Sequence, residues 1–331
     1  MIPNEALGAW LADRSAQAAT MERVDEFARA YRNIPALVEL ERELASTPAN
    51  RSRPILELAR RFLHDPSAIE ACMGSLLGVA RADPFFRPPL RNSSTEILSG
   101  LWLYDGPLLS IFLALVTAEG LAAKRSSRSG AASIAFTGQR SLYRFLRSGG
   151  AVVSIWEAPY IESGFSSESS GRCRLVERRS IEDGETIEVD GRRQGFVVDH
   201  AFSDIVYVQA ITPVGAAPLM TEYDSDTLRF VGASSTDEAS SRIQMMLSLL
   251  RIMDRADAAP VFEEMLASPH FYARWQTMRE FLALDAERAL PHLVRMAFDD
   301  PHPEVRTAAS RTLQIITADV AAAEEEVTCP A

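Results

Sequence analysis

Lysine is almost absent from this chain. Lys124 is the only one, and the other 33 of the 34 basic residues are arginine. Arginine suits two-point pairing with carboxylates or phosphates, although a genomic bias toward arginine and alanine codons explains the same composition. The net charge of −11 argues against a non-specific nucleic-acid binder, because affinity for phosphates requires a basic surface.

Cysteine and the common catalytic motifs are also scarce. Cys72, Cys173 and Cys329 lie far apart without a CxxC spacing, so neither a disulfide framework nor a zinc knuckle is indicated. The chain contains no GxSxG, no P-loop, no GxGxxG after a strand and no HExxH. The chemistry that these motifs support therefore has no basis in the sequence.

Long hydrophobic runs and a leader are missing as well. The N-terminus lacks the basic region and apolar core of a signal peptide. The most hydrophobic stretch, 97–118, is interrupted by Asp105-Gly106-Pro107, which leaves pieces too short to span a bilayer. We expect this stretch to form a buried helix hairpin, and we expect a reducing, cytoplasmic location with no membrane span.

The N-terminal part, residues 1–125, is predicted to be helical. A chain of 331 residues should divide into two or three domains. Apolar residues recur here at spacings of three and four, with Pro, Asn or Asp at the breaks. The predicted helices are Ala6–Phe27, Ile34–Leu44, Ile55–Leu63, Ala68–Ala80 and Leu108–Ala123. A polar run of small residues at 126–133 predicts a linker.

The middle part, residues 134–232, changes to a period of two. Short runs rich in Val, Ile and aromatic residues alternate with turn signals, which is typical of strands. The predicted strands are 151–156, 186–189, 195–198, 205–208, 219–223 and 228–231. This density of strands predicts a small all-β barrel or jelly roll. Its loop 163–171, rich in Ser and Gly, is expected to be mobile.

The C-terminal part, residues 235–320, repeats with a shift of 32. Ser235-Thr236-Asp237-Glu238 predicts a capping box at the first helix. The segment 268–274 then aligns with 300–306, and each period contains a short helix, a turn with Pro and a longer helix. Such a pair must stack on its neighbours to cover its apolar face. The acidic tail, 321–331, is predicted to be disordered.

These helix pairs resemble HEAT repeats. The segment Asp300-Pro301-His302-Pro303-Glu304-Val305-Arg306 is similar to the family's turn and second helix. The resemblance implies an α-solenoid that binds a protein partner. It also implies that Arg242, Arg274 and Arg306 are structural and pair with carboxylates between repeats.

The β-domain resembles the cupin superfamily in its order of strands and glycines. Gly150 precedes Trp156 and Ala158, where the family places two histidines, and Glu162 stands at the position of its acid. Gln194 replaces the last histidine, after Gly191. The resemblance implies a cupin-like barrel deficient in metal ligands, because indole and methyl groups donate nothing to a metal ion. We therefore expect no metal and no cofactor.

Several side chains of this barrel are candidates for a site. The predicted ligand pocket comprises Trp156, Tyr160, Glu162 and Gln194, although aromatic residues of a barrel often pack in its core. His200 follows Asp199 at a strand end and suits a general base, or is a solvated loop residue. The predicted catalytic set for an enzyme is Tyr160, Glu162 and His200. The pairs Arg178-Arg179 and Arg192-Arg193 suit an anion, or are exposed hairpin charges.

On the C-terminal helices, Phe271, Tyr272 and Trp275 are candidates for a partner interface or pack between repeats. The sequence favours a non-catalytic interaction or adaptor protein whose metal-free barrel supports the array or senses a small ligand. The alternative is a metal-free cupin-fold enzyme with isomerase- or epimerase-like acid–base chemistry on a small metabolite.

Overall fold

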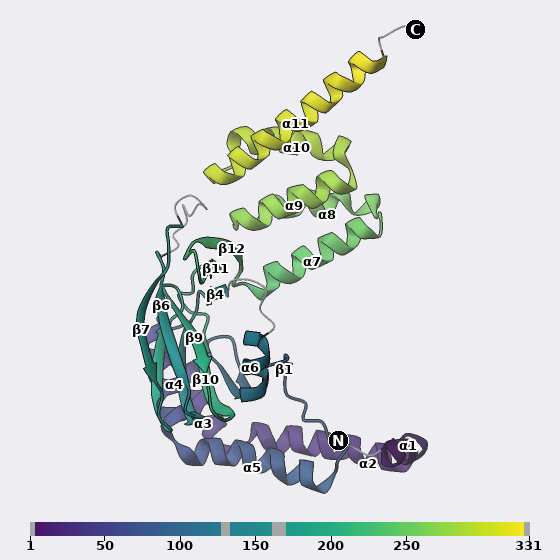
Figure 1. Ribbon diagram of the computed structural model, residues 1–331. Helices are drawn as coiled ribbons and strands as arrows, with labels where there is room; N and C mark the ends of the chain where they lie inside the picture. The colour runs from purple at the N-terminus through teal and green to yellow at the C-terminus, as the bar shows by residue number, and fades with distance from the viewer. Residues whose placement is uncertain (1–3, 127–132, 161–169, 328–331) are drawn as a thin grey trace. The chain divides into compact units, whose positions relative to one another are not determined.

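The computed structural model describes residues 4–126, 133–160 and 170–327 (Figure 1). Within these ranges the chain forms eleven α-helices and twelve strands, and its sheets are antiparallel. It divides into two compact units. Unit 1 comprises 1–159, 172–216 and 222–231, and unit 2 comprises 160–171, 217–221 and 232–331. None of the described helices is long and apolar enough to cross a membrane.

Five helices open unit 1 (Figure 1). Two of them begin at an aspartate whose side chain accepts hydrogen bonds from backbone N–H groups of the first turn: Asp13 at α2 and Asp65 at α5. Such caps satisfy amides that have no partner inside the helix. The helices are α1 Asn4–Ala12, α2 Arg14–Arg32, α3 Pro35–Ala45, α4 Ser52–His64 and α5 Pro66–Ala82.

The prediction of a helix over Leu108–Ala123 is wrong. The stretch 97–118 forms a β-hairpin, β2 Leu98–Asp105 and β3 Ser110–Val116, and a short helix, α6 Ala118–Ser126, follows. Ile111 belongs to a core shared with the helices, whereas Phe112 belongs to a core between two sheets. A strand buried on both faces has a continuous apolar sequence without the alternation that identifies a half-exposed strand. The run of N-terminal helices therefore ends at Ala82.

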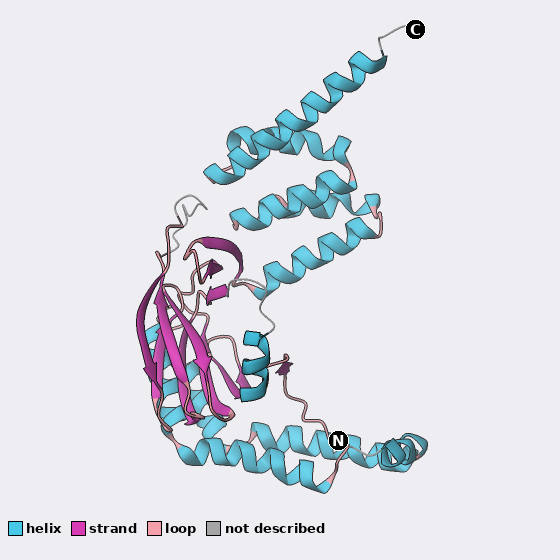
Figure 2. Cartoon of the chain, viewed as in Figure 1, coloured by secondary structure: helices cyan, strands magenta, loops and turns pink. Residues whose placement is uncertain are grey.

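Three sheets make up the β-structure, drawn in magenta in Figure 2. The largest has the order β1-β2-β3-β10-β5-β8, and the others have the orders β7-β6-β9 and β12-β11-β4. All the predicted strands are present, together with β1 to β5 and β7, which the sequence did not predict. The remaining strands are β1 Asn92–Ser94, β4 Ser133–Phe136, β5 Arg140–Arg147, β6 Val152–Glu157, β7 Arg174–Ser180, β8 Thr186–Asp190, β9 Gln194–His200, β10 Ile205–Thr212, β11 Leu219–Asp224 and β12 Phe230–Ser235.

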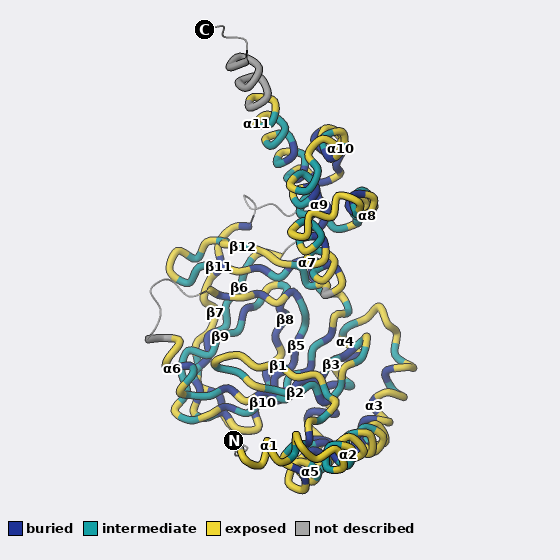
Figure 3. Tube along the Cα trace, turned by 90° about the vertical axis from the view of Figure 1, so that its right-hand side faces the viewer, coloured by how far each residue is buried: buried dark blue, intermediate teal, exposed yellow. Residues whose placement is uncertain are grey.

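The six-stranded sheet has a core on each of its faces. On its inner face Tyr207 pairs with Phe145 across β10 and β5, and the residues of this face pack against Val153 and Phe196 of the β7-β6-β9 sheet. Figure 3 shows these two sheets facing each other, with buried positions in dark blue. On its outer face residues such as Val208 pack under helices α2–α5. The N-terminal helices thus cover the sheet rather than forming a layer of their own.

Unit 2 consists mainly of helices: α7 Glu238–Ile252, α8 Ala259–Met265, α9 Phe271–Leu284, α10 Ala286–Asp299 and α11 Pro303–Val327. The N-cap of α7 is Asp237, whose carboxylate accepts from the N–H groups of Ala239 and Ser240, so the predicted cap at Ser235 is wrong by two residues. Asp has a short side chain that reaches these amides directly. Helix α11 continues to Val327, into the segment predicted to be disordered, where Ala and Glu favour helix.

Candidate functional site

A cleft of about 570 Å³ lies beside strand β9 in unit 1. Strands of both facing sheets and helix α6 contribute its walls. Its lining comprises Ile97, Leu98, Val116, Leu121, Lys124, Ser133, Ala135, Tyr143, Arg178, Phe196, Val197, Val198, Asp199, His200 and Tyr207. Cavities of 300–1,000 Å³ with mostly apolar walls and a few polar groups are typical of small-molecule sites.

Aromatic rings form much of the apolar wall. Tyr143 stacks on Phe196 with ring centroids 5.1 Å apart and meets Tyr207 edge-on at 5.6 Å. The Tyr143 hydroxyl accepts a hydrogen bond from Nε2 of Gln209 at 2.9 Å. Burial raises the pKa of Tyr143 to about 12 and also raises that of Tyr207. Both hydroxyl groups therefore keep their protons at neutral pH and can donate hydrogen bonds, but cannot serve as bases.

A fixed carboxylate stands at the polar side of the cleft. Oδ2 of Asp199 accepts hydrogen bonds from Oγ of the buried Ser154 at 2.8 Å and pairs with Nε of Arg178 at 2.7 Å. Ser154 lies on β6 and Arg178 on β7. Because both neighbouring strands hold it, Asp199 has a defined position, and its charge is largely balanced by Arg178.

Among the described residues of the cleft wall, His200 is the one histidine. It ends β9 opposite Val152 of β6, and its ring meets Phe202 edge-on at 5.6 Å. Among the described residues, no side chain or backbone group forms a hydrogen bond with its imidazole. Histidine is the side chain best suited to exchange protons near neutral pH. Within the described lining, His200 therefore provides the free proton acceptor.

The only lysine of the chain also lines the cleft. Lys124 follows Leu121 by one turn of α6, and Leu121 is buried in the core between the sheets. Residues three apart share one face of a helix, so the packing of Leu121 directs Lys124 toward the cleft. Its uniqueness was visible in the sequence, but its position beside β9 was not.

The three described residues of the predicted pocket are not in this lining. Trp156 packs against an apolar cluster that contains Cys173 and Tyr223, and Oε1 of Gln194 accepts from the N–H of Asp190 at 3.0 Å. Tyr160 is 39% exposed and is not part of the cleft wall. Glu162 lies outside the described residues. Of the two described members of the predicted catalytic set, His200 lies in the cleft and Tyr160 does not.

The positions that correspond to metal ligands in cupins do not fit a metal ion. The Trp156 ring packs against apolar side chains, and the Gln194 amide oxygen is already bonded to backbone. In the part of the chain that the structure describes, no three His, Cys, Asp or Glu side chains are grouped to hold a metal ion. Glu162, the fourth position, is not described.

Unit 2 contains a groove where the three predicted interface residues come together. Phe271, Tyr272 and Trp275 of α9 line a hollow of about 620 Å³ with Val305 and Arg311 of α11. Phe271 also stacks on the ring of His302, with centroids 3.8 Å apart. The aromatic residues thus share one surface and are partly anchored in the helix packing.

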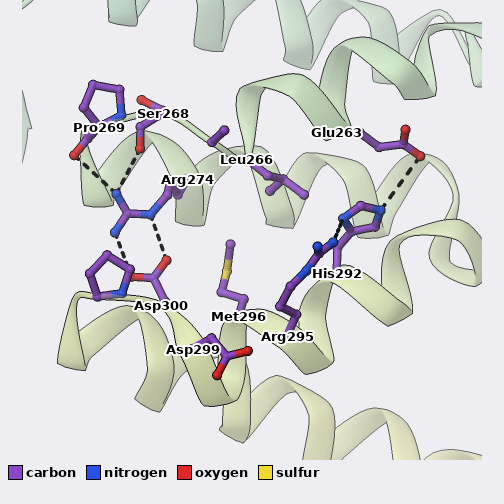
Figure 4. Close-up of a pocket in the computed structure, with 12 residues that line it drawn as sticks. Glu263, Leu266, Ser268, Pro269, Arg274, His292, Arg295, Met296, Asp299 and Asp300 are labelled. Atoms are coloured by element: carbon purple, nitrogen blue, oxygen red, sulfur yellow. Dashed lines mark hydrogen bonds and ion pairs between the residues drawn. The ribbon is translucent and has the colours of Figure 1, made fainter.

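A second hollow in unit 2, of about 690 Å³, is shown in Figure 4. At one end Arg274 pairs with Asp300 and donates to the carbonyl oxygens of Ser268 and Pro269. At the other end Nδ1 of His292 lies 2.9 Å from the Arg295 guanidinium. Because most of these polar groups bond to one another, this hollow is a seam between helices and offers a ligand little.

No protein-family model matches the chain, and no curated protein matches it in sequence. Among solved structures, ectoine synthase from P. lautus is 17% identical over 37% of this chain and 68% of its own, with a TM-score of 0.23. KdgF from Halomonas sp. is 10% identical over 37% and 87%, with a TM-score of 0.24.

A sugar phosphate isomerase from a cupin superfamily, from Silicibacter pomeroyi, is 11% identical over 45% of this chain and 90% of its own, with a TM-score of 0.24. The chemistry of the cleft is therefore inferred from the side chains that line it.

Proposed function

We propose that unit 1 is a cupin-like domain that binds a small metabolite in the cleft beside β9 and transfers a proton to and from it without a metal ion. The observation that carries this proposal is the position of His200, which lines a cavity of about 570 Å³ together with the aromatic side chains Tyr143, Phe196 and Tyr207. A histidine beside a bound molecule is placed to exchange a proton with it.

The side chains of the cleft have different roles in the proposed proton transfer. His200 accepts a proton from the bound molecule and returns it in the second half of the reaction. The hydroxyl groups of Tyr143 and Tyr207 remain protonated, since burial raises their pKa values, and donate hydrogen bonds. Asp199, held by Ser154 and Arg178, keeps the end of β9 in place. Such proton exchange is the chemistry of isomerases and epimerases, and it extends the enzyme alternative of the sequence analysis.

Binding is tested by blocking the cleft. Ala135 is exposed on β4 at the cleft wall, so Ala135→Trp fills the cavity at little cost in stability. Val231→Trp, at an exposed strand position outside the cleft, is the matched control. Native mass spectrometry after incubation with a cell's small-molecule extract should show a bound metabolite for the wild type and Val231→Trp and none for Ala135→Trp. Retention of the same metabolite by Ala135→Trp contradicts the proposal.

A second candidate function is protein binding by unit 2, which we propose to be a HEAT-like array. The groove between α9 and α11 favours it, because Phe271, Tyr272 and Trp275 line one surface. Aromatic residues dominate the energy of many interfaces. The buried pair of Arg274 and Asp300 also supports the array, since it joins α9 to the end of α10 as the resemblance implies.

This candidate is tested with Trp275→Ser and Ile315→Ser. Ile315 is 62% exposed on α11 and does not line the groove. A partner identified by crosslinking and then purified should bind wild type and Ile315→Ser equally, and Trp275→Ser at least about tenfold more weakly, as expected for an interface anchor. Equal binding by all three proteins excludes the groove.

A further inference from the structure

We infer that the ligand of the cleft beside β9 is a carbonyl compound with a hydrogen atom on the carbon next to its carbonyl group, and that the Tyr207 hydroxyl donates a hydrogen bond to the carbonyl oxygen. This inference rests on the proposed function and specifies the class of metabolite and the residue that recognises it.

The first observation is the hydroxyl group of Tyr207. Tyr207 lines the cleft and is 8% exposed, yet its hydroxyl forms no hydrogen bond with any described residue. Two other buried tyrosines have partners. The Tyr31 hydroxyl donates to the carbonyl oxygen of Leu103 at 3.1 Å, and the Tyr143 hydroxyl accepts from Gln209 at 2.9 Å. A buried polar group without a partner is costly, and phenylalanine would fill the same space without that cost. The Tyr207 hydroxyl is therefore available to a bound molecule.

The second observation is that the ring of Tyr207 is held in place. It meets Tyr143 edge-on with ring centroids 5.6 Å apart, and it lies against Phe145 with centroids 5.8 Å apart. Its register partner on β3 is Ala114, which is buried in the same core. A donor fixed by packed rings does not have to reorganise when the oxygen of a ligand arrives.

The third observation is the protonation state of this donor. Burial raises the pKa of Tyr207, and the neighbouring Tyr143 raises it further. Histidine exchanges protons near neutral pH, so Tyr207 keeps its own proton over the range in which His200 accepts one. The cleft therefore combines a neutral hydrogen-bond donor with a proton acceptor.

The chemistry of proton transfer explains why the acceptor is a carbonyl oxygen. An imidazole, with an ordinary pKa of about 6.5, is too weak a base for an unactivated C–H bond. Next to a carbonyl group, the C–H bond breaks and its electron pair forms a C=C bond, while the carbonyl π electrons move to the oxygen. The hydrogen bond from Tyr207 stabilises the resulting enolate oxygen. His200 then returns the proton to carbon, so the isomerisation consumes no oxidant or reductant.

The experiment compares two probes of the same shape. The first is 2-acetylnaphthalene, and the second is 2-isopropenylnaphthalene, in which a methylene group replaces the carbonyl oxygen. For each probe, only the binding that Ala135→Trp abolishes in equilibrium dialysis is assigned to the cleft. The variants are Tyr207→Phe and, as a control that also removes one tyrosine hydroxyl, Tyr104→Phe. Tyr104 lies on β2 and does not line the cleft.

Tyr207→Phe should weaken the ketone about fivefold and the alkene less than about twofold, as expected for loss of one neutral hydrogen bond. Tyr104→Phe should change neither affinity. The infrared band of an isotope-labelled carbonyl group in the bound ketone should lie at lower frequency in the wild type than in Tyr207→Phe, because a hydrogen bond weakens the C=O bond. A purely structural role of Tyr207 would not move this band.

The possible failures are distinguishable. If Tyr207→Phe affects both probes equally, or neither, or if the carbonyl band is the same in both proteins, the carbonyl inference is wrong while the cleft stands. A wild type that binds neither probe also overturns this inference, and the proposed function is then decided by the metabolite experiment above. If Ala135→Trp retains the full binding of both probes, the cleft itself is wrong and the proposed function fails with it.

Discussion

Arg274 of α9 and Asp300 at the end of α10 form a two-point ion pair with both side chains at least 91% buried. Nε and Nη2 of the guanidinium donate to the two carboxylate oxygens at 2.8 and 2.7 Å, and 9% and 4% of the two side chains remain exposed. Nη1 donates to the carbonyl oxygens of Ser268 and Pro269. All hydrogen-bonding partners are therefore supplied by the protein, which is the condition under which a buried ion pair is tolerated.

Breaking this pair should destabilise unit 2 strongly. Arg274→Met leaves a buried carboxylate and Asp300→Leu leaves a buried guanidinium, and each should lower the free energy of unfolding by about 3–5 kcal/mol. The double variant should lose less than either single variant, because no uncompensated charge remains. The unfolding of each unit can be followed by fluorine NMR after incorporation of 5-fluorotryptophan. Trp275 reports on unit 2, and Trp10, Trp102 and Trp156 report on unit 1. Additive losses in the double variant contradict a coupled pair.

Acid should destabilise unit 2 through Asp300. Burial alone would raise the pKa of Asp300, but hydrogen bonds from Arg274 and from the N–H of His302 outweigh burial and lower it. A carboxyl group with a lowered pKa stabilises the folded state above its unfolded pKa of about 3.9, and this stabilisation is lost as the pH falls through the folded pKa. The urea midpoint of the Trp275 resonance should fall between pH 5 and about pH 3 in the wild type, and fall less in Asp300→Asn. An identical slope in the two proteins refutes this assignment.

High pH should destabilise unit 1 through its buried tyrosines. The pKa values of Tyr31, Tyr104, Tyr143, Tyr207 and Tyr223 are all raised, mainly by burial, those of Tyr143 and Tyr223 to about 12. A raised pKa stabilises the folded state below the unfolded value of about 10, and this stabilisation is lost as the pH rises toward the folded value.

The Trp102 and Trp156 resonances should therefore show unfolding above about pH 10, together with a rise in tyrosinate absorbance. Tyr143→Phe should make this transition less steep. Full ionisation of all seven tyrosines at pH 10.5 with unit 1 still folded would show that these side chains are solvated.

Two glycines make a matched pair for testing the packing between β2 and β3. A Cβ atom at Gly100 would lie 2.3 Å from Cζ of Phe112 and 2.4 Å from the carbonyl oxygen of Leu113, whereas a Cβ atom at Gly78 on α5 would meet nothing within 4 Å. Gly100→Ala should cost about 1–3 kcal/mol because ring and backbone must shift. Gly78→Ala should stabilise by up to about 1 kcal/mol through helix propensity. Urea denaturation measures both, and equal effects would contradict the hairpin.

The sequence predicted the strands that are short apolar runs between turn signals. Such runs, rich in Val, Ile and aromatic residues, identified β9 and β10, but β3 lies in a longer apolar stretch and was predicted as a helix. Strand β7 is Arg-rich and exposed, so its composition resembles a loop. A strand can be identified from its own residues. Which strands lie beside it in the sheet depends on pairing between segments that are far apart in the sequence.

The same limit applies to the cleft. His200 was predicted as a base and Arg178 as a candidate for anion binding, each from local sequence. Tyr143 and Lys124 were not, because the pairing of β5 with β10 and the packing of α6 on the inner core place them there. The predicted pocket around Trp156 followed the cupin spacing, but Trp156 and Ala158 pack against an apolar cluster.

The most direct test of the account is deuterium exchange into the bound metabolite. The wild type and His200→Gln are treated with EDTA and incubated in D2O with the metabolite that the wild type retains, and carbon-bound deuterium is measured by mass spectrometry. The account predicts that the wild type incorporates deuterium while His200→Gln binds the metabolite and incorporates at least about a hundredfold less, as expected for loss of a general base. Exchange at the same rate in both proteins, or exchange in the wild type only after a divalent metal ion is restored, would contradict it.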